Sequence, residues 1–299
     1  MIRTRMAALC GIAVASLVLG AMVAAPEGVA AGKTVKVDLD DPAQRLEAFI
    51  RANGDTSGKP SVSYGTGKVY GYIPGEKPRA LFGLEVVGVS RYEKIEGGYL
   101  RLHREIGYYT DLKTGEVITR WFNPWLQRDV DVIPIQNDPV NRRYTIANTS
   151  FNVNASGDDI VFYREVPLRY PNPLDRATYP VNSSGDFYEA MEMFTTFISR
   201  AQLDDPRLSS IPGPGTWTRF GPWLPWMEMG AHQGYLVYHS RSFKPANGLD
   251  GIPAKLREYI ARDNPKYLSA PEKFTEPDET SWTFFKKTLD ERRKQAAPR

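Results

Sequence analysis

At positions 99–106 the chain reads YLRLHREI, a stretch in which polar and apolar residues alternate. Successive side chains of a β-strand point to opposite faces, so this alternation predicts a strand with one strongly polar face. The residues of that face are Tyr99, Arg101, His103 and Glu105. An imidazole, a carboxylate and a guanidinium on one face indicate either a solvent-exposed ladder or the lining of a polar cavity. Which of the two holds decides whether this segment belongs to an active site.

Further strands are predicted on both sides of this segment. They begin near Val62 and cover residues 68–73, 81–94, 99–109, 117–122, 130–136, 160–168 and 234–243. Short polar turns separate them, which is typical of antiparallel sandwiches and barrels. Gly83 and Gly88 lie inside the longest strand, where glycine often marks a bend of a curved sheet. We therefore predict a β-rich (α+β) fold, with a strongly curved antiparallel sheet or a lipocalin-like barrel or sandwich and peripheral helices.

Four helices are predicted around the sheet, over residues 42–52, 187–200, 253–262 and 280–294. Pro42 follows acidic capping residues and suits a first helical turn. In the second helix, Met191, Phe194 and Ile198 are spaced for one apolar face. Helices and strands alternate too little for a doubly wound sheet. We expect one β-rich domain over residues 33–299, with an N-terminal helix and C-terminal helices.

The first 31 residues have the pattern of a signal peptide. Arg3 and Arg5 precede an apolar run over residues 6–25, and small residues at 29–31 suit cleavage. The alternative is a retained membrane anchor, because the apolar run is almost long enough to span a bilayer. We expect cleavage, a periplasmic or secreted protein, and no stable membrane insertion afterwards. The only cysteine, Cys10, lies in this leader, so the mature chain has no disulfide, thiolate nucleophile or Cys-bound metal.

The charge balance and the missing motifs narrow the function. The 38 basic and 35 acidic residues nearly cancel, and the basic C-terminal tail is interleaved with acidic residues, so we expect no nucleic-acid partner. The chain has no HExxH, His-x-His or EF-hand pattern and no Gly-x-Ser-x-Gly, Walker or Rossmann pattern. We predict no cofactor and no metal, although two histidines and a carboxylate from distant strands stay open as a metal site.

Histidine is scarce, with only His103, His232 and His239 in the chain. His103 lies two residues from Glu105, so both point the same way from one strand. We expect His103 to act as general base or acid and Glu105 to orient it, with Arg101 or Arg219 stabilising developing negative charge. His239 would join them if its strand belongs to the same sheet. The competing interpretation is a polar surface ladder.

Two further segments combine unusual side chains. Residues 137–141 read NDPVN, which favours a tight turn over ligand contact. Residues 217–230 read WTRFGPWLPWMEMG, too apolar for a loop in solvent, so this segment either plugs the end of a barrel or forms the wall of a pocket. The residues expected to bind substrate are Tyr99, Trp121, Asn123, Asn137, Asp138, Asn141, Trp217, Arg219, Trp226, Glu228 and Tyr235.

Several short segments together resemble one protein family. They are YGYIPGE at 70–76, DLKTGE at 111–116, WFNP at 121–124, NDPVN at 137–141, the stretch 217–230, and ETSW at 279–282. The set resembles an exported bacterial family labelled domain of unknown function 1838, over nearly all of the mature chain. The family label implies no established activity, so the resemblance implies no catalytic residue.

The leading hypothesis is a cofactor-independent enzyme, a lyase, isomerase or hydrolase, that acts on an apolar or aromatic small molecule inside the curved sheet. It follows from the polar face of residues 99–105, the aromatic segment and the missing cofactor motifs. Two alternatives stay open: a non-catalytic, lipocalin-like carrier of a hydrophobic ligand, and an envelope scaffold protein. A homo-oligomer is also left open.

Overall fold

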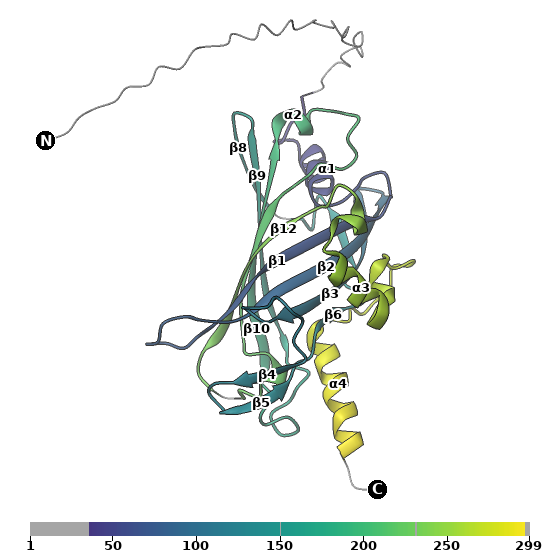
Figure 1. Cartoon of the computed structure of the whole chain (residues 1–299). Coiled ribbons are helices and arrows are strands. Elements are labelled where there is room, and N and C mark those ends of the chain that lie inside the picture. Colours follow the sequence, from purple (N-terminus) through teal and green to yellow (C-terminus); the bar gives the residue numbers. More distant parts are fainter. Residues whose placement is uncertain (1–35, 150, 231, 297–299) are drawn as a thin grey trace, which may run out of the picture. The chain divides into compact units, whose positions relative to one another are not determined.

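A ten-stranded antiparallel sheet organises the residues that the computed structural model describes, which are 36–149, 151–230 and 232–296 (Figure 1). The strands lie in the order β6 (Ile135–Asn137), β3 (Gly98–Thr110), β2 (Arg79–Ile95), β1 (Ser61–Tyr72), β12 (Tyr235–Phe243), β11 (Gly215–Gly221), β10 (Phe187–Ser199), β9 (Asp159–Pro171) and β8 (Asn152–Ser156). A tenth strand, β7 (Arg142–Thr145), also pairs with β3. β4 (Arg120–Asn123) and β5 (Arg128–Asp131) form a separate hairpin.

The helices lie around the sheet and between its ends. They are α1 (Pro42–Asn53), α2 (Arg200–Leu203), α3 (Ala254–Asp263) and α4 (Ser281–Ala296), with 3₁₀ turns at Pro225–Met227, Gly248–Gly251 and Pro265–Leu268. Three of them confirm predicted helices. α1 begins where its signals place it, because Asp41 accepts a hydrogen bond from the backbone of Gln44 and Pro42 opens the first turn.

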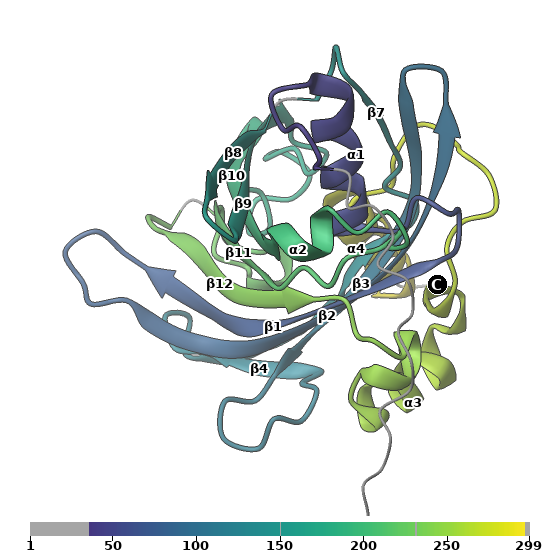
Figure 2. The same ribbon diagram turned by 90° about the horizontal axis from the view of Figure 1, so that it is seen from above.

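The sheet is strongly curved but not closed. Seen from above, β8, β9 and β10 face β3 and β7 across the concave side, and α1 lies between them (Figure 2). Within the described residues, the edge strand β8 does not pair with β6 or β7. The predicted β-rich, curved antiparallel fold is confirmed, whereas strand pairing does not complete a barrel.

The register of the strands defines one continuous concave face. Across four strand pairs, Arg164 lies opposite Phe194, Phe194 opposite Trp217, Trp217 opposite Ser240, and Ser240 opposite Gly67. Directly paired residues share a face, so all five side-chain positions face the same way. The face continues through β2 to β3, where the alternate residues 101, 103, 105, 107 and 109 belong to it.

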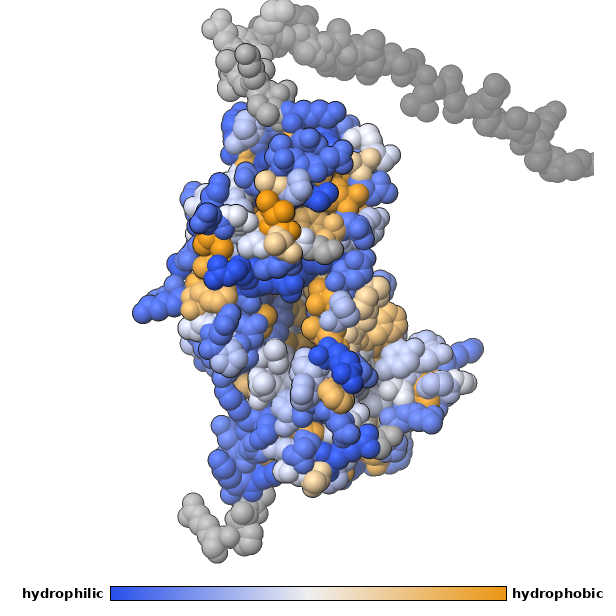
Figure 3. All heavy atoms as spheres, turned by 180° about the vertical axis from the view of Figure 1, so that it is seen from behind, coloured by the Kyte–Doolittle hydropathy of each residue, from blue (hydrophilic) through white to orange (hydrophobic). Residues whose placement is uncertain are grey.

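Bulky side chains fill the two ends of the concave side. At one end, Phe49 of α1 packs on Tyr144 and Phe162 from the two facing halves of the sheet. At the other end, Trp226 packs against Phe82 and Tyr109. Small residues occupy the concave face between these ends; they are Ser63, Gly65, Gly67, Gly88, Ser90, Gly215, Ser240 and Ser242. The side of the molecule turned away from the viewer of Figure 1 is hollowed at mid-height (Figure 3).

The prediction of a helix over 187–200 is wrong, because this segment is the strand β10. It pairs over its length with β9 and over residues 191–196 with β11. Its second half reads Phe194-Thr195-Thr196-Phe197-Ile198, a β-branched and aromatic run that fits a sheet better than a helix. Residues 217–221, the start of the segment expected to plug a barrel or line a pocket, belong to the neighbouring strand β11 (Gly215–Gly221).

The predicted signal peptide over residues 1–31 lies outside the described residues. Among the residues that are described, no helix has the length and apolar character needed to cross a membrane.

Lys244 fastens α1 to the end of β12. Its Nζ donates to the carbonyl oxygens of Arg51 (2.7 Å) and Gly54 (2.9 Å) and to Ser210 Oγ (2.9 Å). The ammonium group thus occupies the negative end of the helix dipole and satisfies carbonyls that α1 leaves open.

Replacing Lys244 by Met should lower the free energy of unfolding by about 2–4 kcal/mol, because several buried acceptors lose their donor. Urea denaturation measures the change. Lys255→Met is the control, since Lys255 forms an exposed ion pair with Glu116, and its loss should cost less than about 1 kcal/mol. Equal effects of the two substitutions would contradict this role of Lys244.

Candidate active site

A hydrogen-bonded chain of three residues lies on the concave face where β2 and β3 pair. His103 is 4% exposed and lies directly opposite Ser90 in the register. Ser90 Oγ is 2.9 Å from His103 Nδ1, and Arg101 Nε donates to the same Oγ over 3.3 Å. Ser90 Oγ thus links Arg101 to Nδ1 of His103, and Nε2 is the ring nitrogen that faces Glu105.

The Glu105 carboxylate lies next to the imidazole of His103, on the side that faces the hollow. Its Oε2 lies 3.8 Å from His103 Nε2, and its Oε1 accepts from Asn137 Nδ2 over 2.9 Å. Gly88, opposite Glu105 in the register, makes room for the ring, because a Cβ there would lie 2.7 Å from His103 Cε1. The Glu105 side chain is 32% exposed, against 5% for His103. The carboxylate is therefore the more accessible of the two groups.

Burial keeps His103 neutral, whereas the contacts of Glu105 keep its carboxylate ionised. Burial lowers the pKa of His103 to about 4, and the positive charge of Arg101 acts in the same direction. Burial alone would raise the pKa of Glu105, but contact with His103 and the charge of Arg101 outweigh it, so the pKa is lowered. Near pH 7 a neutral imidazole thus supports an ionised carboxylate. This geometry favours the reverse of the expected roles, with Glu105 as the base and His103 as the group that orients it.

A second carboxylate faces the same hollow from β10. Glu192 lies opposite Arg219 of β11, and its Oε1 is 3.8 Å from Arg219 Nε. Burial raises the pKa of Glu192, and the negative charge of Glu105 adds to this effect. The side chain of Glu192 is 22% exposed. The two carboxylates, Glu105 and Glu192, face one hollow and interact electrostatically, and their pKa values are shifted in opposite directions.

Arg219 is held in an aromatic box. It is 5% exposed and donates from Nη2 to the hydroxyl of Tyr188. Its Cζ lies 4.9 Å from the ring centre of Tyr238 and 5.7 Å from that of Trp282. Aromatic faces and the Glu192 carboxylate thus compensate the burial of this guanidinium.

Several expected site residues come together here. Arg101, His103, Glu105, Trp217 and Arg219 all lie on the concave face.

Asn137 and Asn141 lie beside this group and hold it in place. Asn137 binds Glu105 and also accepts from the backbone of Ser281 at the start of α4. Asn141 Oδ1 accepts from the backbone N–H of His103 over 3.1 Å. Tyr99 packs in the apolar cluster below α1 instead of lining the hollow.

The expectation that His239 meets His103 is wrong. Tyr238 and Ser240 face the concave side, so His239 points to the opposite face of β12, where it is exposed. Tyr235 shares that outer face and packs on Tyr72. Both residues lie outside the hollow.

The segment 217–230 divides between the two expected roles. Trp217 and Arg219 form the wall, while Trp226 belongs to the buried plug. Trp121 packs on Trp226, and the buried Asn123 donates to the carbonyl of Met227 over 2.8 Å. These contacts tie the β4–β5 hairpin to the plug and assign Asn123 a structural contact. Glu228 pairs with the exposed Arg128, away from the hollow.

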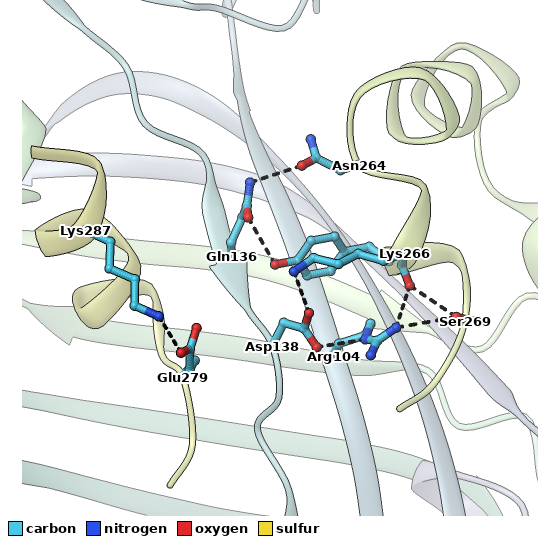
Figure 4. A network of polar contacts seen from close by, with 9 residues as sticks. Arg104, Gln136, Asp138, Asn264, Lys266, Ser269, Glu279 and Lys287 are labelled. Atoms are coloured by element: carbon cyan, nitrogen blue, oxygen red, sulfur yellow. Dashed lines mark hydrogen bonds and ion pairs between the residues drawn. The ribbon is translucent and has the colours of Figure 1, made fainter. Parts of the chain in front are cut away.

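Asp138 points to the outer face of the sheet, as the alternation after Asn137 requires. Its carboxylate lies 2.8 Å from Arg104 Nε and 2.7 Å from Lys266 Nζ (Figure 4). Arg104 also donates to the carbonyl of Lys266. The network fastens the segment after α3 to β3 and β6, so Asp138 has a structural place and does not line the hollow.

Four further residues, Ser90, Tyr144, Arg164 and Glu192, belong to this site although the sequence patterns do not point to them. The helix predicted over 187–200 concealed Glu192, although alternation along 188–198 would have placed it with Phe194 and Tyr188. Arg164 lies in the predicted strand 160–168, and its place beside Phe194 depends on the register between β9 and β10. Arg164 Nη1 donates to Tyr144 OH over 3.4 Å. Burial would raise the pKa of Tyr144, but the charges of Arg164, Arg101 and Arg142 outweigh it and the pKa is lowered. No local pattern in the sequence points to Ser90, because its hydrogen bond to His103 depends on the register between β2 and β3.

The residue types on the concave face do not form a metal site. Among the residues with a defined position, no group of three or more histidine, cysteine, aspartate or glutamate side chains could hold an ion.

The lowered pKa of His103 predicts a pH-dependent stability. In the unfolded chain the imidazole has a pKa near 6.5, so between pH 6.5 and about 4 the unfolded state binds more protons. The free energy of unfolding should therefore fall by about 2–3 kcal/mol as the pH drops through this window. Urea denaturation as a function of pH measures it. His103→Gln should flatten the slope, whereas the exposed His239→Gln should leave it unchanged. Equal slopes in both variants would refute the buried neutral imidazole.

The comparison with known families agrees with the resemblance drawn from the sequence. The family model described as "Protein of unknown function (DUF1838)" matches residues 58–289, from the loop before β1 into α4. No curated protein matches the chain. The chain belongs to the DUF1838 family of proteins of unknown function.

Proposed function

We propose that this protein is an exported, cofactor-independent enzyme, a lyase, isomerase or hydrolase, that acts on an apolar or aromatic small molecule in the hollow of the sheet. One observation carries the proposal: Glu105 and Glu192 face the same hollow with pKa values shifted in opposite directions. Pairs of titratable groups whose environments separate their pKa values are typical of acid–base sites. Export rests on the leader sequence alone.

Glu105 is the general base in this mechanism. Its ionised carboxylate accepts a proton from the substrate or from a water molecule, and His103 Nε2–H stabilises and orients it. Ser90 holds the His103 ring through Nδ1, and Asn137 holds the second carboxylate oxygen of Glu105. The base therefore keeps one geometry, which acid–base catalysis requires.

Glu192 is the general acid. With its raised pKa it donates a proton to a leaving group in an elimination or hydrolysis, or to a neighbouring carbon in an isomerisation. Arg219, 3.8 Å from Glu192, stabilises negative charge that develops nearby. Phe194 and Trp217 lie beside these groups on the concave face and contact the apolar part of the substrate.

The same architecture supports the second candidate, a carrier. In a lipocalin-like interpretation of the fold, α1 fills the gap that strand pairing leaves open. A carrier needs the hollow and its aromatic wall but not the separated pKa values of two carboxylates. Catalysis is therefore the first proposal.

Glu105→Gln should lower the rate of proton transfer by about 10²–10⁴-fold, because it removes a general base while keeping its shape. The measurement is NMR of aromatic ketones, esters and carboxylic acids incubated with the protein in D₂O, which detects exchange of acidic C–H protons as well as conversion. Glu189→Gln is the matched control, since Glu189 lies on the outer face of β10 beside Arg169.

Undiminished activity of Glu105→Gln would overturn the assignment of the base. A wild-type protein that binds members of this panel but neither exchanges nor converts them would favour the carrier.

A further inference from the structure

We propose that the ligand of this hollow is an organic acid, whose carboxylate is bound by Arg101 and Arg164 beside Tyr144 while its apolar or aromatic body lies along Phe194 and Trp217. The inference adopts the binding place of the proposed function and adds the chemical class of the ligand. It does not require that the ligand is converted.

The first support is a group of guanidinium groups around one phenol. Arg164 Nη1 donates to Tyr144 OH over 3.4 Å, and the Cζ of Arg142 lies 5.6 Å from the Tyr144 ring centre. Arg101 approaches the same hydroxyl from β3. Tyr144 itself is 2% exposed. Three cations from β3, β7 and β9 thus converge at one end of the hollow.

These cations are not neutralised by ion pairs. In the part of the chain that the structure describes, none of Arg101, Arg142 and Arg164 has a carboxylate oxygen within 4.0 Å. Arg142 is exposed, but Arg101 and Arg164 are half-buried. A half-buried guanidinium without a counterion is costly, and a bound anion offsets this cost. The site therefore favours a negatively charged ligand over a neutral one.

The acidic groups nearby have partners of their own. Glu105 contacts His103 and Asn137, and Glu192 lies against Arg219. Asp278 accepts from the backbone of Asn141. These carboxylates weaken the positive field at Tyr144 but none of them occupies the place between the arginines.

The second support is an aromatic row that begins at Arg164. Arg164, Phe194 and Trp217 are direct neighbours on β9, β10 and β11. The Cζ of Arg164 lies 4.3 Å from the ring centre of Phe194. The rings of Phe194 and Trp217 are inclined by only 27°, with centres 6.5 Å apart. A carboxylate bound to the guanidinium therefore places its attached ring beside two nearly parallel aromatic rings.

The row then ends in small side chains. Ser240 and Gly67 follow Trp217 in the register, while Tyr238 of β12 packs on one side of the indole with its ring centre 5.4 Å away. The buried indole N–H of Trp217 has no acceptor among the described residues. The small side chains of β12 and β1 leave room for the end of a ligand body that extends beyond the row.

Guanidinium groups bind carboxylates in two-pronged geometry, and a planar ring stacks on Phe and Trp. The matched probes are naphthalene-2-carboxylate and its neutral analogue naphthalene-2-carboxamide. Isothermal titration calorimetry of the wild type at pH 7 and low salt should show at least tenfold tighter binding of the carboxylate. Arg164→Gln should remove most of this preference while leaving the carboxamide affinity within about threefold.

Arg169→Gln is the matched control, because Arg169 lies further along β9, is exposed and pairs with Glu189. It should keep the preference for the carboxylate. Equal affinity of the wild type for both probes, or no binding of the carboxylate, overturns the inference. This comparison needs no variant, so a misfolded Arg164→Gln protein does not decide it.

Binding and catalysis are separable by Glu105→Gln. If this variant loses turnover but keeps the preference for the carboxylate, both proposals are supported. If the wild type prefers the carboxylate but converts no compound, the enzyme proposal fails and the organic-acid site stands. If compounds are converted while the two probes bind equally, the organic-acid site fails and the enzyme proposal stands.

Discussion

The curvature of the ten-stranded sheet is the constraint on which the rest of the structure depends. It turns every second side chain of the central strands into one confined space, so a residue two positions away shares the space and an adjacent residue is excluded from it. His103 and Glu105 meet for this reason, and Arg104 between them points outward into the network with Asp138. Bulky residues from α1 and from the segment around Trp226 fill the ends, while serines and glycines leave the middle open.

The open middle gathers charges that a packed core would not tolerate. Each buried charge needs a partner, because desolvation costs several kcal/mol per ion. Arg219 meets that need with Glu192 and three aromatic rings. His103 meets it by remaining neutral, and Glu105 by contacts with His103 and Asn137. The arginines around Tyr144 are compensated least, which makes that end of the hollow the place where a ligand gains most from supplying charge.

Local patterns in the sequence predict the local structure well and the site only in part. The alternation of residues 99–106 was sufficient to place Arg101, His103 and Glu105 together, and Asp41-Pro42 was sufficient to begin α1. The helix prediction over 187–200 was wrong because Met191, Phe194 and Ile198 also fit a helical period. Only the pairing with β9 and β11 selects the strand. The prediction that His239 meets His103 was wrong because both faces of its strand carry apolar residues. Alternation alone therefore does not reveal which face is concave. Register between distant strands, which brings Glu192 and Arg164 to the site, has no local signature.

Arg101 links the two halves of the proposed site. Its Nε binds the Ser90 hydroxyl that holds His103, and its charge helps to lower the pKa of Glu105. A ligand carboxylate beside Arg101 would offset part of that positive charge. The pKa of Glu105 would then rise, and a carboxylate with a higher pKa is a stronger base. Binding of the acid group would thus strengthen the base only when a ligand is present, so the hollow would hold a weak base when empty and a stronger one when occupied.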